Sequence, residues 1–316
     1  MAQKHDILCM GTALVDSIIK GFDPEPVSAS GYRAISGSLN VGGEAVNEAI
    51  TAAKLGADTA IYCFLGEDDA GNMIEAALKR CRVDTEYILH TSGHPTPVTT
   101  MFVNEDGTRR SITNEAHKYN FHPERDPACL SDTKALILGS LFRAPFNDPD
   151  IVHSVLRAAS DAGVMIFGDT KLPNFRVLSL EDLKASLPLL DFITPNEDEA
   201  KYYTGKETPE EMADVFLGYG IKNVVIKLGA KGCFFKNSSR TIALPPCPIT
   251  AVDATGAGDS FVAGLASELI RGVDLDHALC FANACGAICT TAVGAGTALR
   301  DREQVLRFLK DTSIKP

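Results

Sequence analysis

The sequence has 316 residues, of which 45% are hydrophobic and 22% charged, a composition typical of a globular protein with a sizeable core. Its net charge is −11 and Lys and Arg form no basic run, which argues against a nucleic-acid partner. No apolar run approaches the roughly 18 residues of a membrane span, and no signal peptide is recognisable. We therefore expect a cytoplasmic protein without membrane contact, whose nine Cys are reduced and buried.

Short apolar segments alternate with amphipathic ones along the chain, which predicts an α/β fold with a mostly parallel central sheet and helices on both faces. The expected strands are 7–10, 59–64, 135–138, 164–167, 192–194, 223–227 and 233–235. The expected helices are 44–55, 70–80, 149–162, 209–219, 259–270, 275–291 and 302–310. No linker-like stretch interrupts this order, so we expect a single domain over residues 1–316.

Two segments, approximately 12–40 and 96–115, break the alternation because they are rich in Thr, Val, Ser and Gly and contain no helical pattern. The second resembles a hairpin, with apolar residues at 98–103 before the turn sequence at 104–107. Strands inserted in this way are expected to form a small β-sheet over the carboxyl edge of the central sheet, where ligands bind in open α/β folds. We interpret this sheet as a lid; the alternative is a surface hairpin without a role in binding.

Residues 253–259, Asp-Ala-Thr-Gly-Ala-Gly-Asp, are the most informative motif in the chain. An apolar strand at 249–252 is expected to lead into them, and Asp259 is expected to open the next helix. A helix N-terminus attracts anions, and Gly256 and Gly258 let its backbone approach a ligand closely. A carboxylate there suits proton abstraction from a hydroxyl while backbone amides hold a phosphoryl group. The alternative is a tight turn with Asp259 as a capping residue.

This motif and a second one near the N-terminus together resemble the signatures of the ribokinase/PfkB family of carbohydrate kinases. The N-terminal match comprises Val-Gly-Gly-Glu-Ala-Val-Asn at 41–47, Leu-Gly-Ala at 55–57 and Leu-Gly-Glu-Asp-Asp-Ala-Gly at 65–71. The resemblance covers essentially the whole chain, in order. It implies a ribokinase-like three-layer α/β sandwich with a β-sheet lid. The implied activity is transfer of the γ-phosphoryl group of ATP to a hydroxyl of a small sugar or sugar-like molecule.

The resemblance also assigns roles to matching residues at the acceptor side and at the point of transfer. Asp16, Gly42, Gly43 and Asn47 would hold sugar hydroxyls, Asp259 would be the general base, and the backbone of Gly256, Ala257, Gly258 and Asp259 would form the anion hole. The residue types suit these roles, because carboxylates accept hydrogen bonds from hydroxyls and an amide side chain both donates and accepts. The alternatives are a simple turn at 42–43 and a solvent-facing Asn47.

On the nucleotide side, the resemblance implies contacts with ATP from a strand-ending turn and from the helices that follow. The residues concerned are Lys227, Gly229, Gly232, Thr255 and Asn283. Lys227 stands where the family usually has Thr, which leaves its role open, although a Lys is able to meet a phosphate. For Asn283 a surface position without a ligand is the alternative.

Two metal sites are implied by the same resemblance. Asn196 and Glu199 match the Asn-x-x-Glu element that organises magnesium and its waters near the phosphates; the alternative is a solvated acidic helix start. Asp253 and the loop 292–296 resemble the family's monovalent-cation site. This leaves open whether the protein uses potassium or whether Asp253 only stabilises the turn.

Besides Lys227, two further residues depart from the family pattern. After the strand 164–167 the expected Asp169 is retained, but Lys171 follows where many relatives have Asn. Lys171 suggests a contact with an anionic substrate group or a phosphate, and the alternative is a surface Lys whose head reaches solvent. Glu44 is unusual within the first signature. Because of these departures, the sugar cannot be named from the sequence.

Other functions remain as alternatives to a sugar kinase. A nucleoside kinase of the same family would need aromatic rings in its lid, for which Phe102 and Phe22 are candidates. A catalytically silent sugar-binding regulator would not need an intact Asp259 and Gly258. A dinucleotide-dependent dehydrogenase is disfavoured, because the first strand is not followed by Gly-x-Gly-x-x-Gly. Apolar residues in the thin lid further predict a homodimer joined through it.

Overall fold

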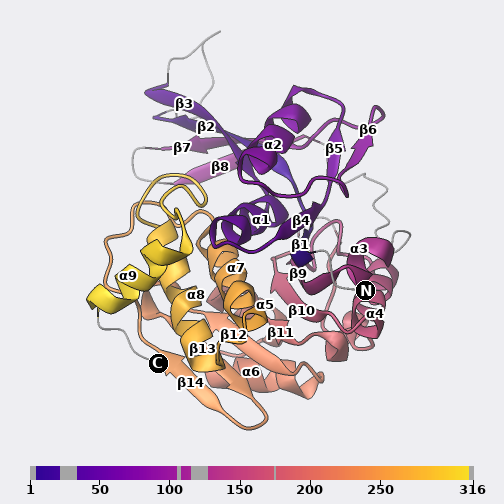
Figure 1. The fold of residues 1–316 in the computed structure, drawn as a ribbon, viewed down its shortest axis with the longest axis vertical. Helices are drawn as coiled ribbons and strands as arrows, with labels where there is room; N and C mark the ends of the chain where they lie inside the picture. The colour runs from indigo at the N-terminus through magenta and orange to yellow at the C-terminus, as the bar shows by residue number, and fades with distance from the viewer. Residues whose placement is uncertain (1–4, 22–33, 105–107, 115–126, 174–175, 313–316) are drawn as a thin grey trace.

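Residues 5–21, 34–104, 108–114, 127–173 and 176–312 are described by the structure, a computed structural model (Figure 1). An eight-stranded sheet runs through these residues. From one edge to the other, its strands are β14 (Thr241–Leu244), β13 (Cys233–Asn237), β12 (Asn223–Lys227), β11 (Phe192–Ile193), β10 (Met165–Thr170), β9 (Thr133–Leu141), β1 (His5–Met10) and β4 (Thr59–Tyr62). Strands β4 to β12 pair in parallel and β13 and β14 form an antiparallel edge, which confirms the mostly parallel sheet.

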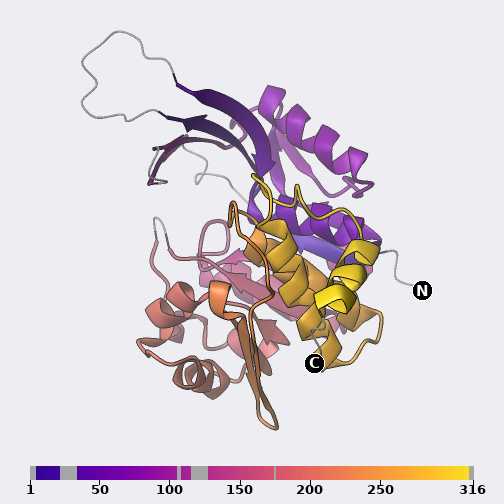
Figure 2. The same cartoon turned by 90° about the vertical axis from the view of Figure 1, so that its left-hand side faces the viewer.

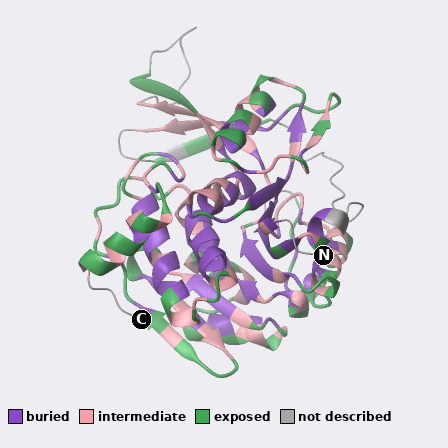
Figure 3. Cartoon of the chain, in the orientation of Figure 1, coloured by how far each residue is buried: buried purple, intermediate pink, exposed green. Residues whose placement is uncertain are grey.

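Helices cover both faces of this sheet because its strands are apolar on both sides. In β1, for example, Ile7 and Cys9 belong to one core and Leu8 and Met10 to the other. The first core contains α1 (Glu44–Lys54), α2 (Asp69–Arg80), α7 (Ala257–Ile270) and α8 (Leu275–Cys289), with α9 (Arg302–Thr312) against α8; the second contains α3 (Pro127–Ser131), α4 (Pro149–Asp161), α5 (Glu197–Thr204) and α6 (Pro209–Gly218). Figure 3 shows the central strands, α7 and α8 as largely buried.

The expected strand 249–252 was wrong: this stretch is a loop between β14 and α7. Pro245, Pro246 and Pro248 remove backbone donors just ahead of it, and the Val252 side chain is 62% exposed instead of packing in the core. The strand that forms this edge of the sheet is β14, which lies earlier in the chain and was not anticipated. The expected strand 59–64 is also interrupted, since β4 ends at Tyr62 and β5 (Phe64–Gly66) pairs with β6 (Leu89–Thr91) in a separate small sheet.

A second sheet of four strands, in the order β3-β2-β7-β8, lies beyond the end of the central sheet where β1 leads into β2 (Figures 1 and 2). Its strands are β2 (Leu14–Lys20), β3 (Ser36–Gly42), β7 (Val98–Val103) and β8 (Arg109–Thr113). All four come from the segments 12–40 and 96–115, as predicted. The connections at 22–33 and 105–107 lie outside the described residues.

The register of this small sheet gives its two faces different characters. Asp16 lies opposite Thr99, which lies opposite Thr113, so these three residues form a polar row on one face. On the other face, Ser17 and Thr100 lie between Leu39 and Ile112, whose side chains are 61% and 69% exposed. The polar face is the one that lines the cavity described below.

From the composition we expected reduced, buried cysteines and no membrane-spanning segment. All nine Cys are free thiols in the structure, and the predicted burial holds for all of them except Cys81, which is half-buried. No helix among the described residues is both long enough and apolar enough to cross a membrane.

Candidate active site

A continuous cavity of about 1320 Å³ lies at the carboxyl ends of the parallel strands, between the lid sheet and the N-termini of α1 and α7. It brings together most of the residues that the sequence singled out. Those in its lining are Asp16, Gly43, Asn47, Asn196, Glu199, Lys227, Gly229, Gly232, Thr255, Gly256, Ala257, Gly258, Asp259 and Asn283. Gly42 and Asp253 were also predicted as site residues but do not line the cavity. The lid strands contribute Thr99, Met101, Ser111 and Thr113.

The N-terminus of α7 opens into this cavity because Gly256 adopts a left-handed conformation, with φ +77°. A Cβ at this position would lie 2.6 Å from the Cβ of Ala295, so only Gly fits the turn. Helix α7 therefore begins at Ala257, two residues earlier than expected. The amide of Ala257 donates to the carbonyl of Ala254 at 3.2 Å, whereas those of Gly258 and Asp259 lie in the first turn, where the helix supplies no acceptor.

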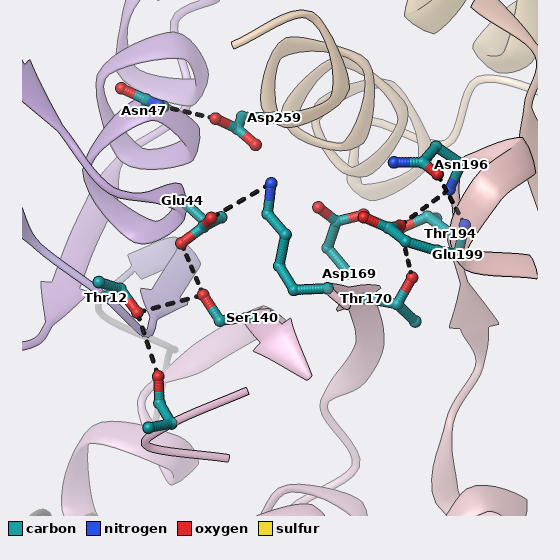
Figure 4. A network of polar contacts seen from close by, with 12 residues as sticks. Thr12, Glu44, Asn47, Ser140, Asp169, Thr170, Thr194, Asn196, Glu199 and Asp259 are labelled. Carbon is teal, nitrogen blue, oxygen red and sulfur yellow. Dashed lines mark hydrogen bonds and ion pairs between the residues drawn. The ribbon is translucent and has the colours of Figure 1, made fainter. Parts of the chain in front are cut away.

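Asp259 is only 6% exposed and lies at the start of α7, beside α1. Its Oδ2 accepts a hydrogen bond of 2.7 Å from Nδ2 of Asn47 (Figure 4). Burial raises the pKa of Asp259 to about 6; Lys171 opposes this rise, the charges of Glu44 and Asp169 add to it, and the Asn47 hydrogen bond lowers the pKa. Asn47, predicted to bind sugar, thus directly contacts the predicted general base, and a carboxylate with a pKa near neutrality is well matched to accepting a proton.

The two glycines before α1 pack against the acceptor side of the cavity. A Cβ on Gly42 would lie 2.4 Å from Oδ2 of Asp16, and one on Gly43, which has φ +93°, would lie 2.3 Å from the carbonyl oxygen of Thr12. The two glycines therefore allow a close approach, as predicted, but the groups that come close are Asp16 and Thr12 of the protein itself. Burial, then the charge of Glu44, raises the pKa of Asp16 to about 6.

Glu44 and Lys171, which both depart from the family pattern, contact each other. Lys171 Nζ lies 3.2 Å from Oε1 of Glu44, and the side chains are 30% and 14% exposed. Ser140 donates to Oε2 of Glu44 at 2.6 Å, and the hydroxyls of Ser140 and Thr12 are 3.2 Å apart (Figure 4). Glu44 and then burial are the largest influences on the pKa of Lys171, which is raised, so both groups are charged at neutral pH. Lys171 is thus neither a solvated surface Lys nor available as an unpaired cation.

Lys227 forms the corresponding pair on the other side of Asp259. Its Nζ lies 2.5 Å from Oδ1 of Asp169, which also accepts a 2.6 Å hydrogen bond from Thr194. A Cβ on Gly258 would lie 3.2 Å from this ammonium group, so the first turn of α7 and Lys227 border the same space. Backbone amides and an ammonium group at one point favour a phosphoryl oxygen there.

Asn196 and Glu199 form a capping box at the start of α5. Oδ1 of Asn196 accepts from the Glu199 amide at 2.9 Å, and Oε2 of Glu199 accepts from the Asn196 amide at 3.0 Å and from the Thr170 hydroxyl at 2.8 Å. Among the described residues Oε1 of Glu199 accepts no hydrogen bond. Glu199 is 3% exposed, and burial raises its pKa. A buried carboxylate with one free oxygen beside the cavity fits magnesium or a magnesium-bound water.

The remaining predicted residues have structural contacts of their own. Oδ1 of Asp253 accepts from the amide and hydroxyl of Thr255, and Oδ2 accepts from the Gly294 amide, which is the turn-stabilising alternative. Gly232 has φ +91°, and a Cβ there would lie 2.1 Å from the Leu244 carbonyl oxygen. Asn283 donates to the carbonyl of Pro245 at 2.9 Å.

Sequence reasoning missed two charged residues at this site. Arg143 lines the cavity just beyond β9. Its position after an apolar strand could have identified it as a site residue, because ligands bind at the carboxyl ends of parallel strands. Glu48 on α1 is fully buried beside Asp169 and Asp259, and its two carboxylate oxygens have no hydrogen-bond partner among the described residues. Burial and then the neighbouring carboxylates raise the pKa of Glu48 well above its ordinary value. The residues around Glu48 in the sequence of α1 gave no indication that its side chain would be buried beside other carboxylates.

A twisted parallel sheet, a β lid, and a carboxylate and glycine turn at a helix N-terminus define an α/β phosphotransferase class. Over residues 4–302 the chain matches the family described as pfkB family carbohydrate kinase. The chain belongs to this family. It is 27% identical to a ribokinase of Haemophilus influenzae over 277 residues, which cover 85% of this chain and 87% of that protein. It is 30% identical to probable fructokinase-3 of Arabidopsis thaliana over 325 residues, covering 98% and 92%.

Solved structures resemble this fold over nearly its full length. The structure of Arabidopsis thaliana ribokinase complexed with ribose and ATP superposes with a TM-score of 0.85 at 28% identity, covering 98% of this chain and 99% of that one. A ribokinase from Thermotoga maritima superposes with a TM-score of 0.79 at 26% identity, covering 97% and 99%. The ribokinase-like fold expected from the sequence is confirmed.

Proposed function

We propose that the protein transfers the γ-phosphoryl group of ATP to a hydroxyl of a small sugar-like acceptor. The observation that carries this proposal is the position of Asp259. It is buried, has a pKa raised to about 6, contacts Asn47 on the acceptor side, and lies in the first turn of the helix whose first amides border Lys227. The ribose and ATP named for the Arabidopsis ribokinase structure support the same two ligands here.

In this mechanism Asp259 accepts the proton of the acceptor hydroxyl as its oxygen attacks the γ-phosphorus, and the bond to ADP breaks. The amides of Gly258 and Asp259, with Ala257 and the left-handed Gly256 shaping the turn, stabilise the phosphoryl oxygens. Lys227 neutralises charge on the same group. Gly229, Gly232, Thr255 and Asn283 border the nucleotide. Positioning and charge stabilisation supply most of the rate enhancement.

Magnesium fits the donor set of this chain on the nucleotide side. Glu199 would hold the ion or its water through Oε1, with Asn196 beside it. Bound there, it would supply positive charge that offsets the charge of the phosphates. For potassium the support is weaker, because both Asp253 oxygens already accept protein hydrogen bonds. Turnover in potassium against sodium buffer measures that requirement.

The nucleoside-kinase alternative loses support from the lid. Thr99 and Met101 of β7 line the cavity, so Phe102, the residue after Met101, belongs to the opposite face of the strand and is not in the lining. Phe22 lies outside the described residues. No aromatic residue of the described lid strands lines the cavity, as a stacked base would need.

The predicted lid-mediated homodimer is retained as a proposal. Leu39 and Ile112 are exposed on the face of the lid that points away from the cavity, where a second copy would cover them. Light scattering at micromolar concentration should give the mass of two chains. The substitution of both residues by Asp should give a monomer, whereas a monomeric wild type would contradict the proposal.

Asp259→Asn tests the proposed function, because it keeps the side-chain shape and removes the proton acceptor. We expect turnover to fall about 10²- to 10⁴-fold, with ATP binding by calorimetry changed little. The assay is coupled ADP release over pentoses, hexoses, sugar acids, sugar phosphates and nucleosides. A variant that kept more than about a tenth of the wild-type rate would remove Asp259 from this role. A wild type that phosphorylated no acceptor would instead support a silent binding protein.

A further inference from the structure

Three cationic side chains line the described part of the cavity, and they differ in their pairing. Lys171 is paired with Glu44, and Lys227 with Asp169. Arg143 has no ion pair among the described residues, and its buried Nε has no hydrogen-bond partner. The Nε atom is closed to the cavity, so a ligand would reach the terminal nitrogens of Arg143. Its guanidinium group is the cation in the described lining that is left without an ion pair.

The backbone holds Arg143 in place. Two residues of the turn that leads into it, Ser140 and Phe142, have φ of +67° and +74°, a conformation that side chains other than Gly rarely adopt. The Arg143 amide donates to the Ser140 carbonyl at 2.9 Å, and the Phe142 ring stacks on Tyr203 at 4.2 Å. Such a turn persists only where its surroundings fix it, so the Arg143 side chain leaves the backbone from a defined position.

This turn is joined to the acceptor side by a chain of polar contacts. Ser140 connects Glu44 to Thr12, and the Thr12 hydroxyl donates to the carbonyl of Ala144, the residue after Arg143. Figure 4 shows Thr12, Ser140 and Glu44 in this chain, with Asn47 and Asp259 beyond it. Asp16, Asp259 and Arg143 all line the same cavity, so a bound acceptor has two carboxylates and a guanidinium group around it.

Electrostatics narrow the chemistry of that other group. Glu44 pairs with Lys171, so of the two cationic side chains Lys171 and Arg143 the latter is the one without an ion-pair partner among the described residues. Asp16 and Asp259 are the carboxylates that would meet hydroxyls. In a chain of net charge −11, no broad positive field attracts anions, and any anion must be held by a local cation. The guanidinium fork matches the geometry of an oxyanion, with which it forms two parallel hydrogen bonds.

We propose that the acceptor is an anionic sugar-like molecule whose carboxylate, phosphate or sulfonate group binds Arg143. This inference rests on the proposed kinase function and specifies the substrate of that same site. The sequence suggested that Lys171 contacts an anionic group, and this inference assigns that contact to Arg143 instead. The pair Glu44–Lys171 then serves to keep Lys171 from competing for the same anion.

The test compares acceptors that differ only in charge. A ketohexose is assayed beside the same sugar bearing phosphate or sulfonate at carbon 6, and an aldohexose beside its hexonate. We expect at least one anionic acceptor to exceed its neutral parent in kcat/KM by about 10- to 100-fold, the value of a charged hydrogen bond. Which anion wins distinguishes the three oxyanions. For the anionic acceptor KM should rise with ionic strength.

Arg143→Met should remove this preference, so that kcat/KM for the anionic acceptor falls to about that of its neutral parent. Arg143→Lys, which keeps the charge but not the fork, should retain part of it. Arg157→Met on the exposed surface of α4 is the matched control and should behave as wild type. If Arg143→Met fails to fold, the ionic-strength dependence of the wild type decides. Preference of the wild type for neutral acceptors would overturn the inference and leave the kinase function standing; absence of any phosphorylation would overturn the kinase function itself.

Discussion

The nucleotide half and the acceptor half of the cavity are built by different means. The nucleotide half depends on backbone: the left-handed Gly256, the first amides of α7, and the turn at Gly229 and Gly232. The acceptor half depends on side chains contributed by separate elements. Those are Asp16 on β2, Glu44 on α1, Arg143 after β9 and Lys171 after β10. A backbone cradle tolerates few sequences, whereas a set of charged side chains changes freely with the substrate. In the proposed reaction, the binding of the phosphoryl group thus depends mainly on backbone, and the choice of acceptor depends on side chains.

The largest effect that separates the halves is expected from Gly258→Val. The branched side chain would enter the space bordered by Lys227 Nζ, which lies 3.2 Å from the Cβ position, and block the phosphoryl group. We expect turnover to fall by more than about 10²-fold, the cost of losing an anion-hole donor. Gly218→Val, at an exposed helical position with open space, is the control for the substitution itself. Normal phosphorylation by a folded Gly258→Val variant would mean that the backbone cradle is elsewhere.

Asp16→Asn should damage the acceptor half alone. Removing this carboxylate weakens its hydrogen bonds to substrate hydroxyls, so we expect KM for the acceptor to rise about 10- to 100-fold. Calorimetry with ATP should give an unchanged affinity. Asp161→Asn, on the exposed side of α4, serves as the control. An equal loss of both ligands would show that the two halves are not separable, because the variant had lost its fold.

The same contrast explains what the sequence was able to predict. Small residues at 253–258 predict a tight turn into a helix, because only Gly fits a position such as 256. Short apolar runs predict strands, and the prediction holds where the run packs into the core of the sheet. The mistaken strand at 249–252 had the apolar pattern but followed a Pro-rich stretch and lacked a place in the sheet. Glu44 and Lys171 lie far apart in the chain, so each looked anomalous alone. Their pairing, like the lack of a partner at Arg143, exists only in three dimensions.

A smaller effect concerns the pH profile. As the proposed general base, Asp259 would act in its ionised form, so turnover should be lost as pH falls below its pKa of about 6. Lys171 lowers this pKa, so Lys171→Met should move the acid limb to higher pH; Glu44 raises it, so Glu44→Gln should move the limb to lower pH. Asp16 titrates in the same range, and the profiles are therefore compared in an Asp16→Asn background. Shifts of the same sign for both variants would contradict the electrostatic assignment.

The smallest effect separates the two roles of Asn196 in the nucleotide half. Its side chain caps α5, and Ser caps equally well, so Asn196→Ala should lower the free energy of unfolding by about 1 kcal/mol while Asn196→Ser should not. If the amide group also helps to organise magnesium, both variants should need more magnesium for half-maximal turnover. Thermal unfolding and a magnesium titration of each variant give the two readouts. A normal magnesium requirement in Asn196→Ser would limit Asn196 to capping, and the metal would then depend on Glu199 without it.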